Sequence, residues 1–569
     1  MQEGSKPMYE IKTEKNVRVK MRDGILIACD VYRPDAEGQF PAILSMSPYG
    51  KDIQRLNVPP KSRELGEEWG VIESGDTEYL VSRGYAHVII DVRGVGYSEG
   101  TFDCCQRKEQ EDGYDLVEWA AHQPWCNGNV GMLGISYPAF IQYLVAAQQP
   151  PHLKAIFPHD GWGDMYRDVS HHGGIFMHGW LPDDWTTDLA MGFNARPASL
   201  SMYSEEELKR QVEKWLKHEV LNKHEKMVNS LLHPPYKPII FDWIINEFDG
   251  PYYWERSAYT KWDKIKVPTY LGSEFHDYPV AMHLPGAING WAGIKAPKKL
   301  AIRPEAPEVP FHEFHDEVVR WYDYWLKGID TGIMDEPPIK VWVRGAEEWK
   351  YAHDWPLPET KWTDYYLRTN NLLIEEGTPT TEEAVDSFNH KPVFPVTMGS
   401  TPLDPMPEYL SYSTEPLNQD TEVIGHIALY LYASIATDDA DFIVKVKDVS
   451  PDGTEFVLSR GWLKASHREV DKKKSKPWQP YHPHLRAIPV VPDEINEYAI
   501  EIRPIANLFR KGHKIKLEIW SCDYPSDPMD VTLSWPTWSH LSYDKETSYK
   551  IYHSLRYPSR LLLPRIPKG

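Results

Sequence analysis

Gly131-Met-Leu-Gly-Ile-Ser136-Tyr-Pro-Ala-Phe-Ile-Gln142 is the stretch that decides the fold. An apolar run at 130–133 predicts a buried strand, and residues 140–148 predict a helix. Ser136 stands between them, two residues after a glycine, which is the sequence form of a nucleophile elbow. In such an elbow the sharp turn exposes the serine hydroxyl and points the next backbone N–H at a developing oxyanion. Because so short a match also arises by chance, its meaning depends on the surrounding chain.

The segments around the elbow alternate between strand and helix. Strands are predicted at 40–47, 86–91, 155–159, 267–272 and 299–302, and helices at 77–83, 106–123 and 311–327. This alternation is typical of an open parallel sheet, so we predict an α/β fold with an α/β-hydrolase core. Ahead of it, residues 17–34 alternate in polarity around Asp23-Gly24, which predicts a β-hairpin with a two-residue turn.

Two further modules are expected beside this core. Residues 161–245 hold no strand-like run and predict a helical cap over the active site, whose strongest helix begins with a capping box of Ser204 and Glu207. Short strand-like runs after Gly332, the first at 339–344, predict a C-terminal jelly-roll β-sandwich. The expected domains are 1–160 (core, first part), 161–245 (helical cap), 246–335 (core, second part) and 336–569 (jelly roll).

Composition limits the partners. The formal net charge of −21 argues against nucleic acid and anionic membrane surfaces, and no apolar run is long enough for a membrane helix. The five cysteines show neither metal-ligand spacing nor a disulfide framework, so we expect a cytoplasmic protein. A homo-oligomer stays open, since the flat faces of a β-sandwich can serve as interfaces.

A serine nucleophile needs a base and an acid, and in this fold the chain order is serine, acid, histidine. Asp277 follows the strand after the cap and is the preferred acid, with Glu274 as its competitor. No histidine directly follows the next strand, but His312 and His315 lie in the first turn of the next helix. Helix N-termini and strand C-termini share one edge of such a sheet, so either imidazole can face the elbow. His312 is preferred because it is nearer the strand, although a helix-capping or core role fits both residues equally well.

Several motifs together resemble the CocE/NonD hydrolase family, the cocaine-esterase and X-Pro dipeptidyl-peptidase group of serine hydrolases. They include Met21-Arg-Asp-Gly24, Asp91-Val-Arg-Gly-Val-Gly-Tyr-Ser-Glu-Gly100, Gly134-Ile-Ser-Tyr137 and Arg320-Trp-Tyr-Asp-Tyr-Trp-Leu-Lys-Gly328. The resemblance implies that Ser136 is the nucleophile, that Asp277 is the triad acid, and that the Tyr137 backbone N–H and the Tyr49 hydroxyl form the oxyanion hole. It implies no metal and no organic cofactor.

The chain departs from the family at the histidine. The family's Gly-Pro-Trp-x-His stretch reads Arg303-Pro-Glu-Ala-Pro here. Either His312 or His315 has taken over as the base, or the triad is incomplete.

We therefore predict a serine hydrolase that cleaves a small-molecule carboxylic ester or amide through an acyl-enzyme at Ser136. One alternative is an X-Pro dipeptidyl-peptidase or an amino-acid-ester or β-lactam acylase, for which Asp160, Asp164 and Asp168 are candidate carboxylates for a substrate amine. The other is a non-catalytic ligand-binding protein that has lost its base.

Overall fold

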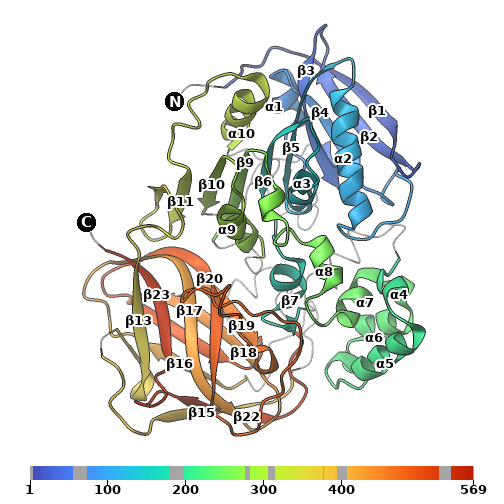
Figure 1. Ribbon diagram of the computed structural model, residues 1–569. Helices are drawn as coiled ribbons and strands as arrows, with labels where there is room; N and C mark the ends of the chain where they lie inside the picture. Colours follow the sequence, from blue (N-terminus) through green and yellow to red (C-terminus); the bar gives the residue numbers. More distant parts are fainter. Residues whose placement is uncertain are drawn as a thin grey trace.

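The first part of the chain builds a ten-stranded sheet that is mostly parallel (Figure 1). The computed structural model describes residues 4–55, 73–177, 196–275, 282–304, 314–375, 377–393, 407–523 and 540–567. In spatial order the strands are β1 (Ile11–Lys20), β2 (Leu26–Pro34), β4 (Ala86–Asp91), β3 (Phe40–Ser47), β5 (Cys126–Ile135), β6 (Leu153–His159), β9 (Thr269–Glu274), β10 (Lys298–Arg303), β11 (Ile339–Val343) and β12 (Glu348–Ala352). The predicted α/β core is therefore present, and its strands form where the sequence has continuous apolar runs.

Helices cover both faces of this sheet. They are α1 (Thr77–Ser82), α2 (Arg107–Ala121), α3 (Tyr137–Ala147), α9 (Leu284–Gly293) and α10 (His315–Tyr322), the last continuing as a π-helical turn over Asp323–Lys327. A side chain at Gly113 of α2 would collide with Val145 of α3 and approach Met46 of β3, so these two helices share one face. Leu133 of β5 meets α1 and α10 on the other face. Every residue of α3 is buried, which fixes the helix that follows Ser136.

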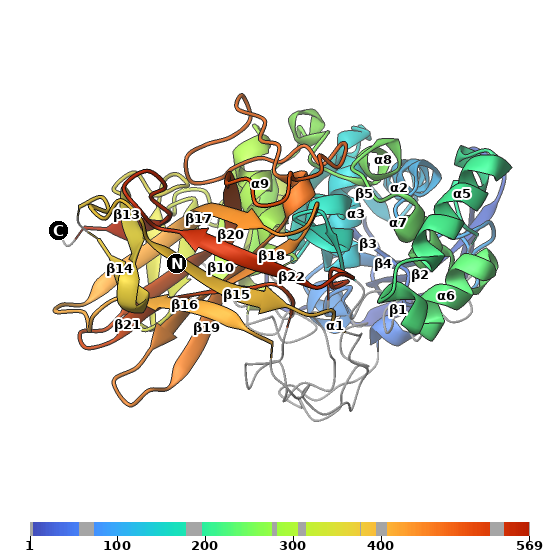
Figure 2. The ribbon, with the colours of Figure 1, turned by 90° about the horizontal axis from the view of Figure 1, so that it is seen from below.

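A block of helices is inserted between β6 and β9. It contains α4 (Ser199–Met202), α5 (Glu205–Leu216), α6 (Glu225–Leu232), α7 (Pro238–Ile245) and α8 (Pro251–Arg256). The capping box predicted for α5 is confirmed, with Ser204 and Glu207 bonding each other's backbone N–H. Figures 1 and 2 both place the block at one flank of the molecule, with α8 between it and the core. The expectation of no strand here is wrong in one detail, because His171–His172 and Ile175–Phe176 pair as a short ribbon, β7 and β8.

The C-terminal part is a second sheet of eleven strands with its own apolar core. In spatial order they are β15 (Val385–His390), β22 (Thr547–Tyr552), β17 (Thr421–Ile435), β20 (Asn496–Phe509), β19 (Glu455–Lys464), β18 (Asp441–Val449), β21 (Lys514–Trp520), β16 (Tyr409–Ser413), β14 (Leu372–Ile374), β13 (Lys361–Arg368) and β23 (Arg560–Ile566). β23 also pairs with β17, which curls the sheet back on itself. Alternating buried positions along β15 and the second half of β13 point into the interior, as in other layered β domains.

Two other expectations need correction. The turn after β1 holds three residues, because Met21 N–H donates to the Ile25 carbonyl and Gly24 N–H donates to that of Met21. The strand expected at the start of the C-terminal module is β11, and it pairs with β10 of the first sheet, since β10 otherwise presents an open parallel edge. None of the helices in the described parts of the chain combines the length and apolar character that a membrane crossing needs.

Candidate active site

Ser136 occupies a strained position between β5 and α3. Its φ of 55° and ψ of −117° lie where residues other than glycine are rarely found. The turn needs Gly134, because a Cβ there would lie 2.3 Å from the Cβ of Pro138. Backbone bonds fix both sides of the turn: Ile135 N–H donates to the Glu73 carbonyl, and Ser136 N–H donates to the His159 carbonyl at 3.1 Å. This geometry is the nucleophile elbow that the sequence predicts.

His283 is the partner of the serine. Its Nε2 lies 3.2 Å from Ser136 Oγ, and both side chains are more than nine-tenths buried. His283 immediately precedes α9, whose N-terminus packs closely on the loop after β6: a Cβ on Gly286 would lie 1.8 Å from the Gly161 carbonyl oxygen. Trp162, in that loop, stacks on the imidazole at 6.1 Å between ring centres. An imidazole held against a serine hydroxyl in this way can act as its general base.

A buried carboxylate stands at the end of β6, next to the strand that carries Ser136. Asp160 directly follows β6, and its Oδ2 lies 2.8 Å from His159 Nδ1. Burial alone would raise the pKa of Asp160, but the charge and hydrogen bond of His159, the charge of His283 and a hydrogen bond with Glu274 lower it to about 2. Asp160 is therefore ionised near the imidazole. Burial and then the negative charge of Asp160 raise the pKa of the neighbouring Glu73 well above its usual range.

Tyr137 is locked by its side chain. Its hydroxyl donates to Glu109 at 2.8 Å and accepts the Cys105 N–H at 3.0 Å, so the ring points into the core. Only its backbone N–H, at the start of α3, can then serve the elbow. Burial raises the pKa of Glu109 to about 8. Tyr49 follows β3 beside this group, with its ring packed edge-on against that of Tyr137 at 6.5 Å.

Of the predicted acid and the two predicted bases, the structure describes only His315. Asp277 and His312 lie outside the described residues, so the structure says nothing of them. His315 opens α10, where its Nε2 lies 3.9 Å from Asp76 Oδ2 and its ring packs at a tilt against that of Tyr79, with 4.3 Å between the ring centres. The first turn of α10 therefore presents His315 to α1, whereas the hydroxyl of the serine meets a different histidine.

Sequence reasoning missed His283 and Glu109. It sought the base after β10, as the family order suggests, whereas His283 lies between β9 and α9. Its one local signal is the Leu-Pro-Gly that follows, which marks a helix start and fixes the place of the preceding residue. Glu109 carried no signal, because a glutamate in a helix is normally solvated.

A cavity of about 560 Å³ lies between the α/β core and the C-terminal domain, and neither Ser136 nor His283 lines it. Gly163, Arg167 and Asn289 line it from the core, and Tyr481, His484 and Arg503 line it from the β domain. Its volume lies in the range of small-molecule sites, roughly 300–1,000 Å³.

Two groups of described side chains have the residue types and spacing that a metal ion would need. His159, Asp160 and Glu274 form one, buried beside His283. Glu118, His122 and His152 form the other, partly exposed and remote from the elbow. The hydrogen bond of Asp160 with His159 gives the buried group an internal role, in which the imidazole already holds the carboxylate.

Two family models match the chain. The X-Pro dipeptidyl-peptidase (S15 family) model matches residues 23–306, and the X-Pro dipeptidyl-peptidase C-terminal non-catalytic domain model matches residues 331–544. A curated relative, the cocaine esterase of a Rhodococcus species, is 28% identical over 97% of this chain and 98% of its own. The chain belongs to the CocE/NonD family of serine hydrolases.

Solved structures agree with this membership in the CocE/NonD family. A CocE/NonD family hydrolase from Staphylococcus aureus superposes with a TM-score of 0.78 at 25% identity, covering 98% of this chain and 94% of that one. An aminopeptidase from a Thaumarchaeota archaeon shares the fold, with a TM-score of 0.74 at 19% identity over 98% of this chain and 97% of its own. The protein is thus a hydrolase of the CocE/NonD type, with an α/β-hydrolase-type core and a β-rich C-terminal domain.

Proposed function

We propose that this protein is an esterase in which Ser136 attacks the substrate carbonyl and His283 takes the serine proton. The observation that carries the proposal is the 3.2 Å contact between Ser136 Oγ and His283 Nε2 at a strained elbow. The Tyr137 backbone N–H and the Tyr49 hydroxyl stabilise the tetrahedral oxyanion. His283 then protonates the leaving alcohol, and water hydrolyses the acyl-enzyme by the same path in reverse.

Asp160 is proposed as the acid that stabilises the His283 imidazolium. Its carboxylate is buried, ionised and electrostatically coupled to His283. It also stands at the end of β6, beside the strand that carries Ser136, and its N–H donates to the Gly272 carbonyl, which fixes it to β9. Asp277 stays the alternative that the sequence predicts, and the experiment below separates the two.

An ester is favoured over a substrate with a free amine. Asp164 forms an ion pair with Arg167 at 2.8 Å, and Asp168 accepts the N–H bonds of Gly163 and Asp164 while facing Arg503. Asp164 and Asp168 line the cavity, but each is already paired with an arginine of this chain and is not left for an ammonium group. The Rhodococcus relative is named an esterase, which supports the same class.

The finer architecture belongs to the same proposal. We take the inserted helices as a cap that shapes the substrate pocket and the C-terminal sheet as a jelly roll. The domain boundaries expected from the sequence stay predictions, and the pairing of β11 and β12 with the core sheet favours a last boundary after Ala352. A cytoplasmic location and a homo-oligomeric state also stay expectations.

A fluorophosphonate probe tests the proposal, with mass spectrometry to locate the adduct and Ser136→Ala as the control. We expect one adduct at Ser136 in the folded wild type, and its loss in His283→Ala but not in His315→Ala. No adduct in the wild type would favour the ligand-binding alternative. If His283→Ala is still labelled and still hydrolyses an activated ester while His312→Ala does neither, the protein is a serine hydrolase whose base is His312 and not His283. Comparing Asp160→Asn with Asp277→Asn identifies the acid in the same way.

A further inference from the structure

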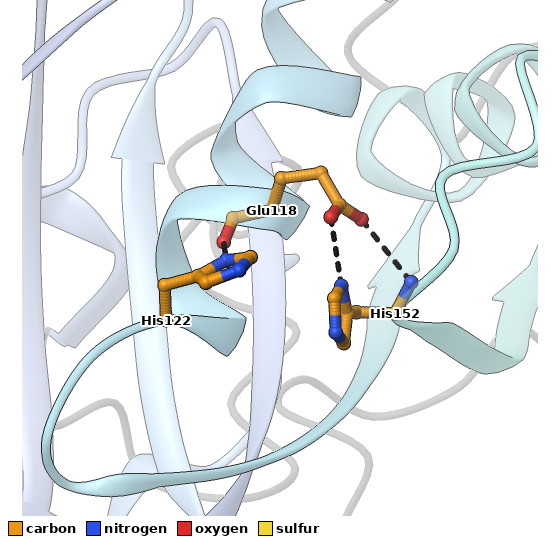
Figure 3. Close-up of side chains that lie close together, drawn as sticks. All are labelled: Glu118, His122 and His152. Carbon is orange, nitrogen blue, oxygen red and sulfur yellow. Dashed lines mark hydrogen bonds and ion pairs between the residues drawn. The ribbon is translucent and has the colours of Figure 1, made fainter.

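Glu118, His122 and His152 gather at the end of α2, partly exposed to solvent (Figure 3). Glu118 lies in the last turn of α2, and His122 immediately follows that helix. His152 comes from the loop before β6 and is anchored there because its carbonyl accepts the Val130 N–H at 3.0 Å. One nitrogen of each imidazole and one carboxylate oxygen lie within 4.8 Å of one another.

Hydrogen bonds prepare these side chains as ligands. His122 Nδ1 lies 2.7 Å from the Glu118 carbonyl oxygen, which can only accept, so Nδ1 carries the proton and Nε2 presents a lone pair. An imidazole that donates its other N–H to a carbonyl is the usual arrangement of metal-binding histidines. Glu118 also accepts the backbone N–H of His152 at 3.1 Å and lies 2.7 Å from His152 Nδ1, which holds the second ring in place (Figure 3). A metal ion bound to this nitrogen and to Glu118 would take the place of the Nδ1 proton.

We propose that Glu118, His122 and His152 form a binding site for a divalent transition-metal ion of the zinc class. Two imidazoles and one carboxylate are a donor set that suits Zn²⁺ and leaves a fourth position for water. The side chains of Glu118 and His152 are only 22% and 34% exposed, so solvent ions can enter while the group stays ordered. The strongly negative net charge of the chain attracts cations to its surface.

The place of the site in the sheet decides what the ion does. Both attachment points lie at the N-terminal ends of β5 and β6, whereas Ser136 lies at the C-terminal end of β5. Ten residues of strand separate the two ends, a distance of about 33 Å. A bound ion therefore links the end of α2 to the start of β6 and stabilises the core without entering the reaction.

Zinc binding to the purified full-length chain tests the proposal by equilibrium dialysis against ZnCl₂, with thermal unfolding as the second measurement. We expect zinc to raise the unfolding temperature of the wild type. His122→Ala and His152→Ala should each weaken zinc binding by more than about tenfold and abolish the shift. His353→Ala, an exposed histidine after β12, is the matched control and should behave as the wild type.

Hydrolysis of an activated ester in the absence of metal checks that the variants are folded, because neither histidine takes part in the reaction. Zinc binding and stabilisation that persist in both variants would overturn the assignment. So would a wild type whose unfolding temperature zinc leaves unchanged.

Discussion

Two groups of histidine and carboxylate side chains, at opposite ends of one sheet, face different tasks. His159, Asp160 and Glu274 are buried beside His283, and there a charge must be balanced by fixed partners. Glu118, His122 and His152 stand at the surface, where water and ions can supply those partners. The same residue types thus make a fixed electrostatic environment in one place and an exchangeable ligand set in the other. Burial, more than residue type, sets the difference.

The largest expected contrast is between two histidines. His283→Ala should lower kcat for an activated ester by more than about 10⁴-fold, because the serine then has no base. His122→Ala should leave kcat within about twofold, since the surface group lies at the far end of the strands. Steady-state kinetics on both variants makes the comparison. Equal losses would mean that His122 acts through the fold, which circular dichroism would reveal.

Next in size is the contrast between two carboxylates. Asp160→Asn should lower kcat by about 10²- to 10⁴-fold with little change in KM, because the amide cannot stabilise the imidazolium. Glu118→Gln should change neither constant. Since the pKa of Asp160 is about 2, the acid limb of the pH–rate profile should follow His283 and not this carboxylate. An Asp160→Asn variant with normal kcat would return the role of acid to Asp277.

Glu109 allows a test of burial, because burial is the largest cause of its raised pKa and its hydrogen-bond partners, the Tyr137 hydroxyl and the Cys105 N–H, are neutral. Its pKa is about 8 in the fold and near 4.5 in the unfolded chain, so between these values the folded protein holds a proton that the unfolded chain has released. Stability should fall as pH rises through that window. Glu109→Gln removes this dependence of stability on pH. The free energy of unfolding of the variant, relative to that of the wild type, should therefore be higher at pH 8 than at pH 4.5. Urea unfolding at both pH values measures it, and equal wild-type and variant slopes would contradict the assignment.

The smallest expected effect is that of the surface hydrogen bond between Glu118 and His152 in the absence of metal. His152→Ala should reduce the free energy of unfolding by no more than about 1 kcal/mol, since partly exposed pairs contribute little. Denaturant unfolding in the presence of a chelator measures this difference. A large loss would show that the group is a structural hydrogen-bond network before any ion binds.

Local features of the fold were readable from the sequence. Strands such as β3 and β4 appear at their predicted bounds, because a continuous apolar run of strand length has to be buried in a covered sheet. The position of Ser136 in an elbow could also be predicted, because an elbow is formed by residues adjacent in the chain and needs a glycine at 134 for steric reasons.

Contacts between side chains that lie far apart in the sequence could not be predicted from it. His283 reaches Ser136 only because α9 packs on the loop that carries Trp162, and no periodicity in the sequence encodes that contact. The polarity pattern of α2 likewise suggests a solvated Glu109, which α3 covers. The pairing of strands could not be predicted for a similar reason. The strand β11 was predicted, but the sheet that it joins depends on the open edge of β10, with which it pairs.

The join between β6 and β9 affects how this protein can evolve. The two strands pair directly, Ile156 with Thr269 and His159 with Gly272, although the whole helical block lies between them in the chain. Because each doubling of a loop costs only about 0.6 kcal/mol in closure entropy, inserted helices can be lengthened, shortened or exchanged while the sheet keeps its register. Selection can therefore remodel the insertion as a separate module. Ser136 and Asp160 follow β5 and β6, on one side of that join, and stay in place while the insertion changes.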